Sequence, residues 1–334
     1  MTFIGLARGT TTPVRTDPTG RHGPTQRQAR GPGWRRTSRG LYVPADVEPT
    51  PLQRVAEAGA LLPAGVVAVT GWAALCWRRA RWHTGTRADG SAVPIDVAAV
   101  TQCLRDQAGV RVHRERFDPE DVVELDGLLV MSAVAAVVFV MRHAVDLDSA
   151  VEALDMTYRA DLVTPEQVSA WLVAHPGLVG IRQAREALRL ADENSWSPQE
   201  TRARLAWERH TGRRPLANRP VFDLDGDLLG TPDLLDLIGP CGEYDGDHHL
   251  DRGQRRVDLE REQRLLDHGL TPFTIVAGDL GSGRLQRRLD SAFARAARVP
   301  PEDRRWTLEP PPWWRPTLTV AQRGGPREEA RPGR

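Results

Sequence analysis

The stretch from Gly230 to His249, GTPDLLDLIGPCGEYDGDHH, decides how the last third of the chain is interpreted. It holds Asp233 after a proline and Glu243 in a short, mostly uncharged segment. If these residues belong to neighbouring strands, their carboxylates reach the same edge of one sheet. Carboxylates that converge repel one another unless a divalent cation neutralises them, and Mg²⁺ or Mn²⁺ prefers oxygen ligands. The stretch therefore predicts a metal site with Mg²⁺ (or Mn²⁺) as the cofactor.

Two histidines, His248 and His249, follow these carboxylates directly. Close to a bound ion that polarises a phosphodiester, either imidazole can serve as a general base or an additional contact. Asp245 lies between Glu243 and the histidines, and with Gly246 it also fits a simple turn. Both histidines also fit an ordinary loop.

Acidic and basic residues are segregated along this part of the chain. Residues 220–251 contain nine carboxylates and no arginine, and arginines follow at once. Three of them, Arg255, Arg256 and Arg261, fall on a predicted helix over 253–268. The helix face they form predicts contact with nucleic-acid phosphates, although such runs are also common on solvated faces.

The elements around the acidic stretch predict a compact α/β unit. Ser197-Pro198-Gln199-Glu200 is typical of a helix start with a capping box, in which Glu200 is the third helical residue. Asp225-Gly226 predicts the turn of a hairpin with strands over 221–224 and 227–229. A strand over 241–244, the arginine-rich helix, a strand over 272–276 and a helix over 280–298 complete the order α-β-β-β-α-β-α.

The middle of the chain, residues 48–190, predicts a separate α/β domain with a helical second half. Its first half favours a helix over 50–62 and then strands over 66–70, 94–100, 110–116, 122–125 and 128–130. Its second half favours helices over 132–145, 147–158, 164–175 and 178–191. We find no cluster of titratable groups at functional spacing there, so no ligand is predicted for this domain.

Composition excludes several classes of protein. The chain has 334 residues, enough for two domains, and all 45 basic residues are arginine. Without lysine, a Schiff-base enzyme and a P-loop ATPase are excluded.

Three widely spaced cysteines give no disulfide framework or thiolate zinc site, which suggests a reducing compartment. The longest apolar run, residues 128–141, is shorter than the ~20 residues of a membrane span. Together with an N-terminus unlike a signal peptide, this predicts a cytoplasmic protein that does not bind membranes.

The two ends of the chain differ from the middle. Residues 1–40 hold eight arginines and one acid, so they carry +7 while the remainder carries −6. We expect residues 1–47 to comprise a basic arm, disordered to about Gly33, and a wing-like β-ribbon over 34–44, and the arm suits DNA by counterion release. A solvated tail without function is the alternative. Residues 300–334, rich in proline and tryptophan, are expected to be mostly disordered, with Trp306, Trp313 and Trp314 attached to a domain surface.

The residues quoted above resemble a known family. The run from Ser197 through 230–233 and 242–249 to Asp258-Leu259-Glu260-Arg261 is similar to an actinobacterial domain-of-unknown-function family related to very-short-patch-repair (Vsr-like) endonucleases. These belong to the PD-(D/E)XK, restriction-endonuclease-like superfamily, and the resemblance covers residues 191–299. Arg39-Gly-Leu-Tyr-Val-Pro44 and residues 48–190 resemble AbiE-type antitoxins, whose winged helix binds DNA.

The resemblance implies an α/β (α+β) protein with a restriction-endonuclease-like core and Mg²⁺-dependent hydrolysis of DNA. Asp233 and Glu243 would be metal ligands and Glu200 an outer ligand, although Glu200 also fits a purely structural cap. The lysine position of the family signature falls on Asp245, so His248 or His249 would supply the missing group. The alternatives are a non-catalytic DNA-binding or antitoxin-like regulator, with a cognate toxin as partner, and a protein-interaction module that uses the Trp/Pro tail.

Overall fold

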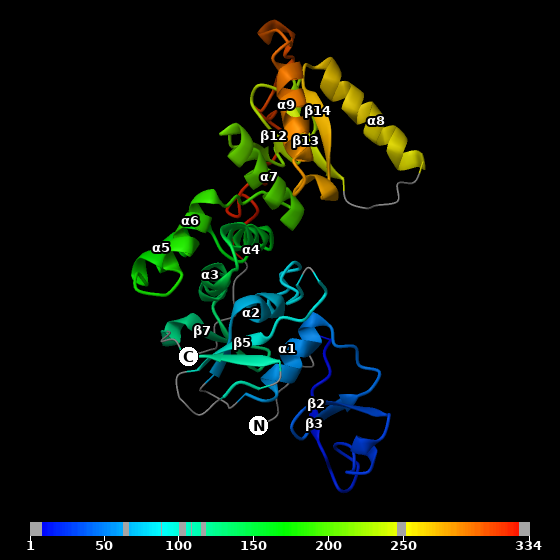
Figure 1. Cartoon of the computed structure of the whole chain (residues 1–334), viewed down its shortest axis with the longest axis vertical. Coiled ribbons are helices and arrows are strands. Elements are labelled where there is room, and N and C mark those ends of the chain that lie inside the picture. The colour runs from blue at the N-terminus through cyan, green and yellow to red at the C-terminus, as the bar shows by residue number, and fades with distance from the viewer. Residues whose placement is uncertain are drawn as a thin grey trace. The chain divides into compact units, whose positions relative to one another are not determined.

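The computed structural model describes residues 9–62, 67–87, 89–99, 105–107, 109–114, 118–245 and 252–326, with the backbone alone over 252–258 (Figure 1). The chain forms two compact units. One comprises the described residues up to Ala144 together with Glu166–Ala184, and the other comprises Val145–Pro165 and Arg185–Pro326. Helices and several sheets, parallel and antiparallel, make it an α+β protein, the fold class that the sequence predicts.

The first unit begins with a small antiparallel sheet of order β1-β3-β2, formed by Val14–Arg15, Leu41–Pro44 and Trp34–Ser38. The ribbon predicted over 34–44 is confirmed as the β2–β3 hairpin, in which Trp34 pairs with Pro44. We expected only these two strands, but β1, which comes from the arm, pairs with β3 and adds a third strand.

The expectation that the arm lacks structure is wrong for the residues described from Gly9 onward. The Asp17 carboxylate accepts hydrogen bonds from the backbone N–H groups of Thr19, Arg21 and His22, at 2.9, 3.0 and 2.9 Å. The Thr19 hydroxyl also donates to this carboxylate at 2.7 Å, and this bond, together with the backbone bonds, holds the pKa of Asp17 well below its usual range. A segment poor in apolar residues is thus ordered by hydrogen-bonded turns and strand pairing, which composition does not reveal.

A five-stranded mixed sheet of order β6-β5-β4-β8-β7 forms the core of the first unit. All five strands lie where the sequence predicts them: β4 at Val67–Val69, β5 at Ile95–Ala99, β6 at Val110–His113, β7 at Val122–Leu125 and β8 at Leu128–Met131. The helices are α1 (Pro51–Gly59), α2 (Gly71–Trp77) and α3 (Ala133–His143). α2 packs on β5 and β8 and contacts both α1 and α3.

The apolar run over 128–141 is a buried strand followed by a buried helix. Ser132, its only polar residue, lies between them and accepts a hydrogen bond from the backbone N–H of Ala135 at 3.2 Å. This N-cap begins α3 and so divides the run into β8 and α3. None of the helices that the structure describes is long and apolar enough to cross a membrane.

The predicted boundary at residue 190 does not match the two units. Helices α4 (Leu147–Arg159), α5 (Pro165–Ala174) and α6 (Ile181–Leu190) form as predicted. However, α4 belongs to the second unit, α5 lies almost wholly in the first, and the division falls within α6. α4 packs on α7 (Pro198–Thr211) of the second unit because a buried carboxylate, Asp155, pairs there with Arg204.

The second unit is built on a mixed four-stranded sheet of order β14-β13-β12-β9. Its strands are Thr271–Val276, Pro240–Asp245, Leu234–Leu235 and Leu216–Ala217, and only β13 and β14 are parallel. α8 (Arg252–Asp267) connects these two strands, as a parallel pair requires. α9 (Arg284–Ala296) follows β14 and lies beside it (Figure 1).

Side chains that alternate along the strands bury both faces of this sheet. Leu234 packs with Trp207 of α7 and Leu289 of α9 on one face. Leu235 packs with Leu265 of α8 on the other. The sheet therefore lies between helices, with α7 and α9 on one side and α8 on the opposite side.

The predicted hairpin forms, but it is not part of this sheet. β10 (Val221–Asp223) and β11 (Leu228–Gly230) pair with each other, and β15 (Trp306–Thr307) pairs with β10. The two-residue turn that we expected needs a positive φ at both of its residues, but in this turn only Gly226 has one. The backbone N–H of Asp223 bonds to the Asp227 carbonyl, so the loop is one residue longer than expected. In the order α-β-β-β-α-β-α, β9 and β12 therefore take the places that we expected the two strands of the hairpin to fill. Each is only two residues long, too short to show the alternating hydrophobic pattern of a strand.

The expectation that the chain after residue 300 is mostly disordered is also wrong as far as residue 326. Trp306 lies in β15, and the Trp314 ring contacts Phe222 with centroids 5.2 Å apart. Val320 is fully buried. As predicted, tryptophans attach this segment to the domain, while Trp313 is exposed.

Candidate carboxylate site

Asp233 and Glu243 lie across a strand pair, as the sequence predicts. Leu234 pairs with Gly242 in the antiparallel β12–β13 ladder, so the same register places Asp233 opposite Glu243. Residues directly opposite each other project to one face of a sheet. The Asp233 Oδ2 atom also accepts a hydrogen bond of 2.6 Å from the backbone N–H of Tyr244, which holds the carboxylate against β13.

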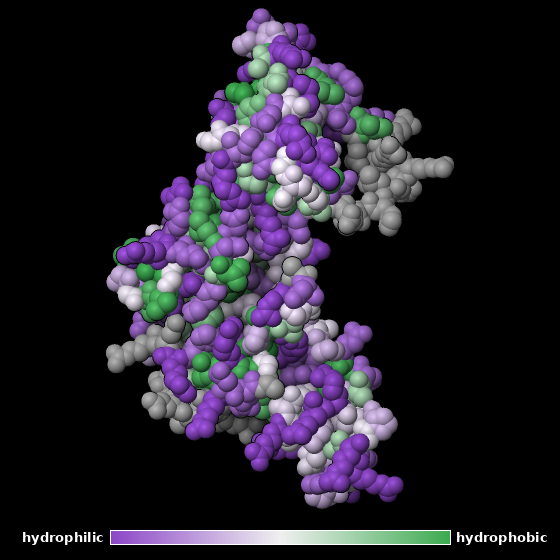
Figure 2. Space-filling view, viewed as in Figure 1, coloured by the Kyte–Doolittle hydropathy of each residue, from purple (hydrophilic) through white to green (hydrophobic). Residues whose placement is uncertain are grey.

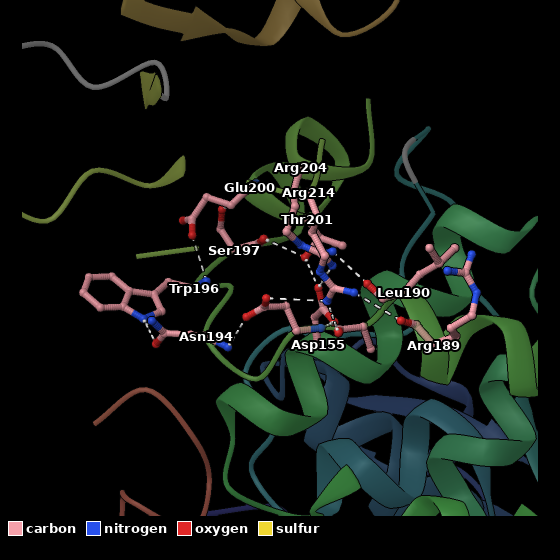
Figure 3. Close-up of polar contacts among 12 residues, drawn as sticks. Asp155, Arg189, Leu190, Asn194, Trp196, Ser197, Glu200, Thr201, Arg204 and Arg214 are labelled. Atoms are coloured by element: carbon pink, nitrogen blue, oxygen red, sulfur yellow. Dashed lines mark hydrogen bonds and ion pairs between the residues drawn. The ribbon is translucent and has the colours of Figure 1, made fainter. Parts of the chain in front are cut away.

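Glu200 reaches the same region from the first turn of α7. The Ser197 hydroxyl accepts a hydrogen bond from the Glu200 backbone N–H at 3.2 Å, so the predicted N-cap is confirmed. The other half of the capping box differs: Glu200 Oε2 accepts from the Trp196 N–H at 2.8 Å, one residue earlier than expected (Figure 3). The same oxygen accepts from Asn218 Nδ2 at 2.7 Å. Glu200 is therefore a buried structural carboxylate as well as a neighbour of Asp233.

The three carboxylates interact electrostatically. Burial, followed by the negative charges of Glu200 and Glu243, raises the pKa of Asp233 to about 7, although the Tyr244 N–H and Arg261 act in the opposite direction. The positive charge of Arg261 therefore does not offset the burial of Asp233.

Arg261 is the basic residue of α8 that the structure places at this site. Its guanidinium forms an ion pair with Glu243. Arg261 thus bonds to a carboxylate of the candidate site, and it brings a positive charge next to β13 from another element. The side chains of Arg255 and Arg256 lie outside the described part of the chain.

The remaining predicted residues do not join the cluster within the described residues. Asp245 ends β13 and is exposed, and within the described chain no hydrogen bond or ion pair links it to Asp233 or Glu243. His248 and His249 lie outside the described residues.

The donor set fits a hard divalent cation in type. Asp233, Glu243 and Glu200 supply only carboxylate oxygens, the ligands that Mg²⁺ and Mn²⁺ favour. Each keeps one oxygen without a hydrogen bond to any residue of the described ranges. The oxygens of these three carboxylates do not all lie within 4.8 Å of one another. Among the described residues, that criterion is met only by a different group of side chains, in the first unit.

A basic surface on the same unit was not predicted. Phe273 and α9 line a hollow of about 380 Å³ that contains Ser291 and four arginines: Arg284, Arg287, Arg288 and Arg295. They recur about once per turn, opposite the buried Leu285 and Leu289. Hydrophilic residues cover most of the visible surface around α8 and α9 (Figure 2). The spacing of arginines over 284–295 was the available signal.

Two of these arginines have no counterion among the residues that the structure places. Arg288 pairs with the fully buried Asp279 at 2.9 Å, and Arg295 donates to the Pro272 carbonyl at 3.3 Å. Arg284 and Arg287 form no side-chain hydrogen bond or ion pair within the described ranges. The hollow therefore presents uncompensated positive charge to solvent, as a site for phosphate groups requires.

The prediction of no titratable cluster in residues 48–190 is wrong. Asp118, Asp121 and His175 of the first unit bring their ligand atoms within 4.8 Å of one another. Asp118 precedes the short 3₁₀ turn Pro119–Asp121, Asp121 is its last residue, and His175 follows α5. Because these segments are distant in sequence, only the tertiary structure brings them together.

Comparisons of this chain with protein-family models, with curated proteins and with solved structures find no match. The fold and the side chains therefore define the class: an α+β protein of two units, one of which carries both a carboxylate cluster on a mixed sheet and an arginine-lined surface.

Proposed function

We propose that the second unit is a divalent-metal-dependent DNA endonuclease with a restriction-endonuclease-like core. The position of Asp233 opposite Glu243 on neighbouring strands, with Glu200 of α7 near enough to act on the charge of Asp233, carries this proposal. The order α7-β9-β12-β13-α8-β14-α9 supports it, because it is the α-β-β-β-α-β-α order expected for that core.

In this proposal Asp233 and Glu243 hold Mg²⁺ or Mn²⁺, and Glu200 acts as an outer ligand. The ion would supply Lewis-acid polarisation of a phosphodiester and a more acidic bound water. Glu243 is paired with Arg261, so Arg261 would provide a positive charge beside the residues that would hold the ion. His248 or His249 assists proton transfer, and Asp245 stands where the family signature has its lysine.

The chain itself contributes binding and positioning of the DNA backbone. The α9 arginines neutralise phosphates, and Arg255 and Arg256 are proposed as further phosphate contacts. Because such contacts release counterions, affinity for DNA falls as salt rises.

Nicking of supercoiled plasmid by the full-length protein in Mg²⁺ or Mn²⁺ tests the proposal. We expect Asp233→Asn and Glu243→Gln each to lower the nicking rate about 100-fold or more, since each removes a negatively charged ligand of the cation that would stabilise the transition state. Asp225→Asn and Glu302→Gln, at exposed positions away from the cluster, are matched controls that keep wild-type rates. Equal nicking by all four variants, or none by the wild type, would contradict the assignment.

A second candidate is a non-catalytic, antitoxin-like DNA-binding regulator with a cognate toxin as partner. It is favoured by Asp245 at the lysine position and by the α9 arginines, which bind DNA whether or not cleavage follows. Fluorescence anisotropy in EDTA at several salt concentrations measures this binding alone. Arg284→Gln/Arg287→Gln should flatten the salt slope by up to ~2, since each phosphate contact contributes ~0.9.

The matched control for that pair is Arg182→Gln/Arg305→Gln, which removes two exposed arginines outside the hollow. Binding without nicking favours the regulator, and both together favour the nuclease. An unchanged slope in Arg284→Gln/Arg287→Gln would exclude α9 as the DNA-binding surface.

A further inference from the structure

The cluster of Asp118, Asp121 and His175 lies in the first unit and plays no part in the proposed nuclease reaction. It joins one imidazole and two carboxylates from two separate segments. Asp118 is 71% exposed at its side chain, whereas His175 is 21% exposed. The cluster therefore combines a shielded nitrogen donor with an oxygen donor that is open to solvent.

The tautomer of His175 is set by a group outside the cluster. Its Nδ1 atom lies 2.8 Å from the backbone carbonyl of Trp171, and a carbonyl can only accept, so Nδ1 carries the proton. In the neutral imidazole Nε2 is then a lone-pair donor to a metal. A histidine oriented through Nδ1 by a backbone carbonyl is the usual arrangement behind a metal ligand.

Asp121 is likewise oriented by residues outside the donor set. Trp171 Nε1 donates to its Oδ2 at 3.1 Å, and the Ser132 hydroxyl donates to its Oδ1 at 3.1 Å. The Trp171 ring stacks on His175 with centroids 3.8 Å apart. Trp171 thus positions two of the three donors, which limits the freedom that ligand binding would otherwise have to remove.

The spacing between His175 and Asp118 differs from that of the other histidine–aspartate pairs described. His113–Asp96 and His210–Asp290 are each 2.7 Å apart, as expected for a charge-assisted hydrogen bond. His175 Nε2 and Asp118 Oδ2 are 3.3 Å apart. Zinc bonds of about 2.0 to 2.1 Å place the ligand atoms of a tetrahedron about 3.3 Å apart. An octahedral ion with similar bond lengths would need about 2.9 Å.

We propose that Asp118, Asp121 and His175 form a zinc site, with water as the fourth ligand. Three protein ligands and an open position are the pattern of a zinc ion accessible to solutes. The site needs no thiolate, so it agrees with the cysteine pattern of the chain.

Isothermal titration of ZnCl₂ into chelator-treated, full-length protein tests the site. The titration is run in an Asp233→Asn background, so that the carboxylate cluster of the second unit does not contribute. We expect one equivalent of zinc to bind, and Asp118→Asn and His175→Gln each to weaken binding at least tenfold. His210→Gln, which removes a histidine–aspartate pair with no third donor, is the matched control and should bind as before.

Two further readouts separate ligand loss from misfolding. Asp118→Asn changes an exposed side chain, so without metal the variant and its parent should have the same melting temperature. Zinc should raise the melting temperature of the parent more than that of the variant. Co²⁺ in place of zinc should give the intense visible absorption of four-coordinate cobalt, and the variant should lose it. The proposal would be overturned if zinc did not bind, or if the parent, Asp118→Asn and His175→Gln bound it equally. His175 and Asp118 would then form only a hydrogen-bonded ion pair.

Discussion

At the scale of single residues, burial decides which titratable groups are unusual. Asp233 and His83 both have pKa values shifted first of all by desolvation, in opposite directions because one charged form is an anion and the other a cation. The proximity of Asp233 to Glu243 could be predicted from a short segment between two strands. The burial of His83 could not, because nothing in its local sequence indicates it.

His83 gives the first unit a pH-dependent stability. Burial lowers its pKa to about 4, whereas the unfolded chain keeps about 6.5. Between these values the unfolded chain binds a proton that the folded chain does not, so the free energy of unfolding falls as the pH drops from about 6.5 towards 4. We expect a loss of about 1–2 kcal/mol between pH 7 and pH 5.

Urea unfolding of the full-length protein at pH 5 and pH 7 measures this loss. His83→Gln should remove that part of the pH dependence, and His22→Gln, at an exposed position, should retain it. A wild-type pH dependence in His83→Gln would show that other groups cause the loss.

At the scale of elements, a buried ion pair attaches α4 to α7. Asp155 Oδ2 accepts hydrogen bonds of 2.8 Å from Arg204 Nη2 and from the Thr201 hydroxyl, and Oδ1 accepts one of 2.7 Å from the Asp192 backbone N–H (Figure 3). Arg204 also donates to the Leu190 carbonyl at 2.7 Å. Periodicity predicts both helices but not this partnership, which is why α4 was expected in the other domain.

Removing one member of this pair should be far more costly than removing an exposed pair. We expect Arg204→Met to lower the free energy of unfolding by about 3–5 kcal/mol, because it leaves the buried Asp155 without its cationic partner. Arg202→Met breaks the partly exposed pair of Arg202 with Glu152 on the same two helices, and should cost about 1 kcal/mol or less.

Urea unfolding of both variants and of Asp155→Leu/Arg204→Met completes the test. The double variant should lose less than the sum of its single changes, because no charge remains unpaired. A similar small cost for Arg204→Met and Arg202→Met would mean that the buried pair does not hold α4.

At the scale of the whole molecule, the second unit is assembled from segments far apart in the chain. Arg323, near the end of the described residues, donates from Nε to Asp161 at 2.7 Å and from Nη2 to the Tyr158 and Glu193 carbonyls at 2.9 and 3.2 Å. Together with the buried Val320, it attaches the C-terminal segment to the loop after α4. The segment therefore belongs to the domain.

We expect Arg323→Gln to destabilise the second unit by about 1–3 kcal/mol, because three bonds to partly buried acceptors are lost. Arg315→Gln, at an exposed position of the same segment, should change stability by less than about 0.5 kcal/mol. Urea unfolding and the rate of chymotryptic cleavage within residues 312–326, which does not depend on arginine, measure both. Equal cleavage rates in the two variants and the wild type would show that the segment is held by other contacts.

The sequence by itself determined the elements whose signals are local: the strands and, apart from α2, the helices of residues 48–190, the N-cap at Ser197, and the pairing of Asp233 with Glu243 across a short connection. Hydrophobic period and capping act within a few residues, so they can be predicted without a fold. Only the tertiary structure decided which strands form the core sheet, which unit holds α4, and how Asp118, Asp121 and His175 meet. Those outcomes depend on burial and on contacts between distant segments, and the local sequence does not encode either.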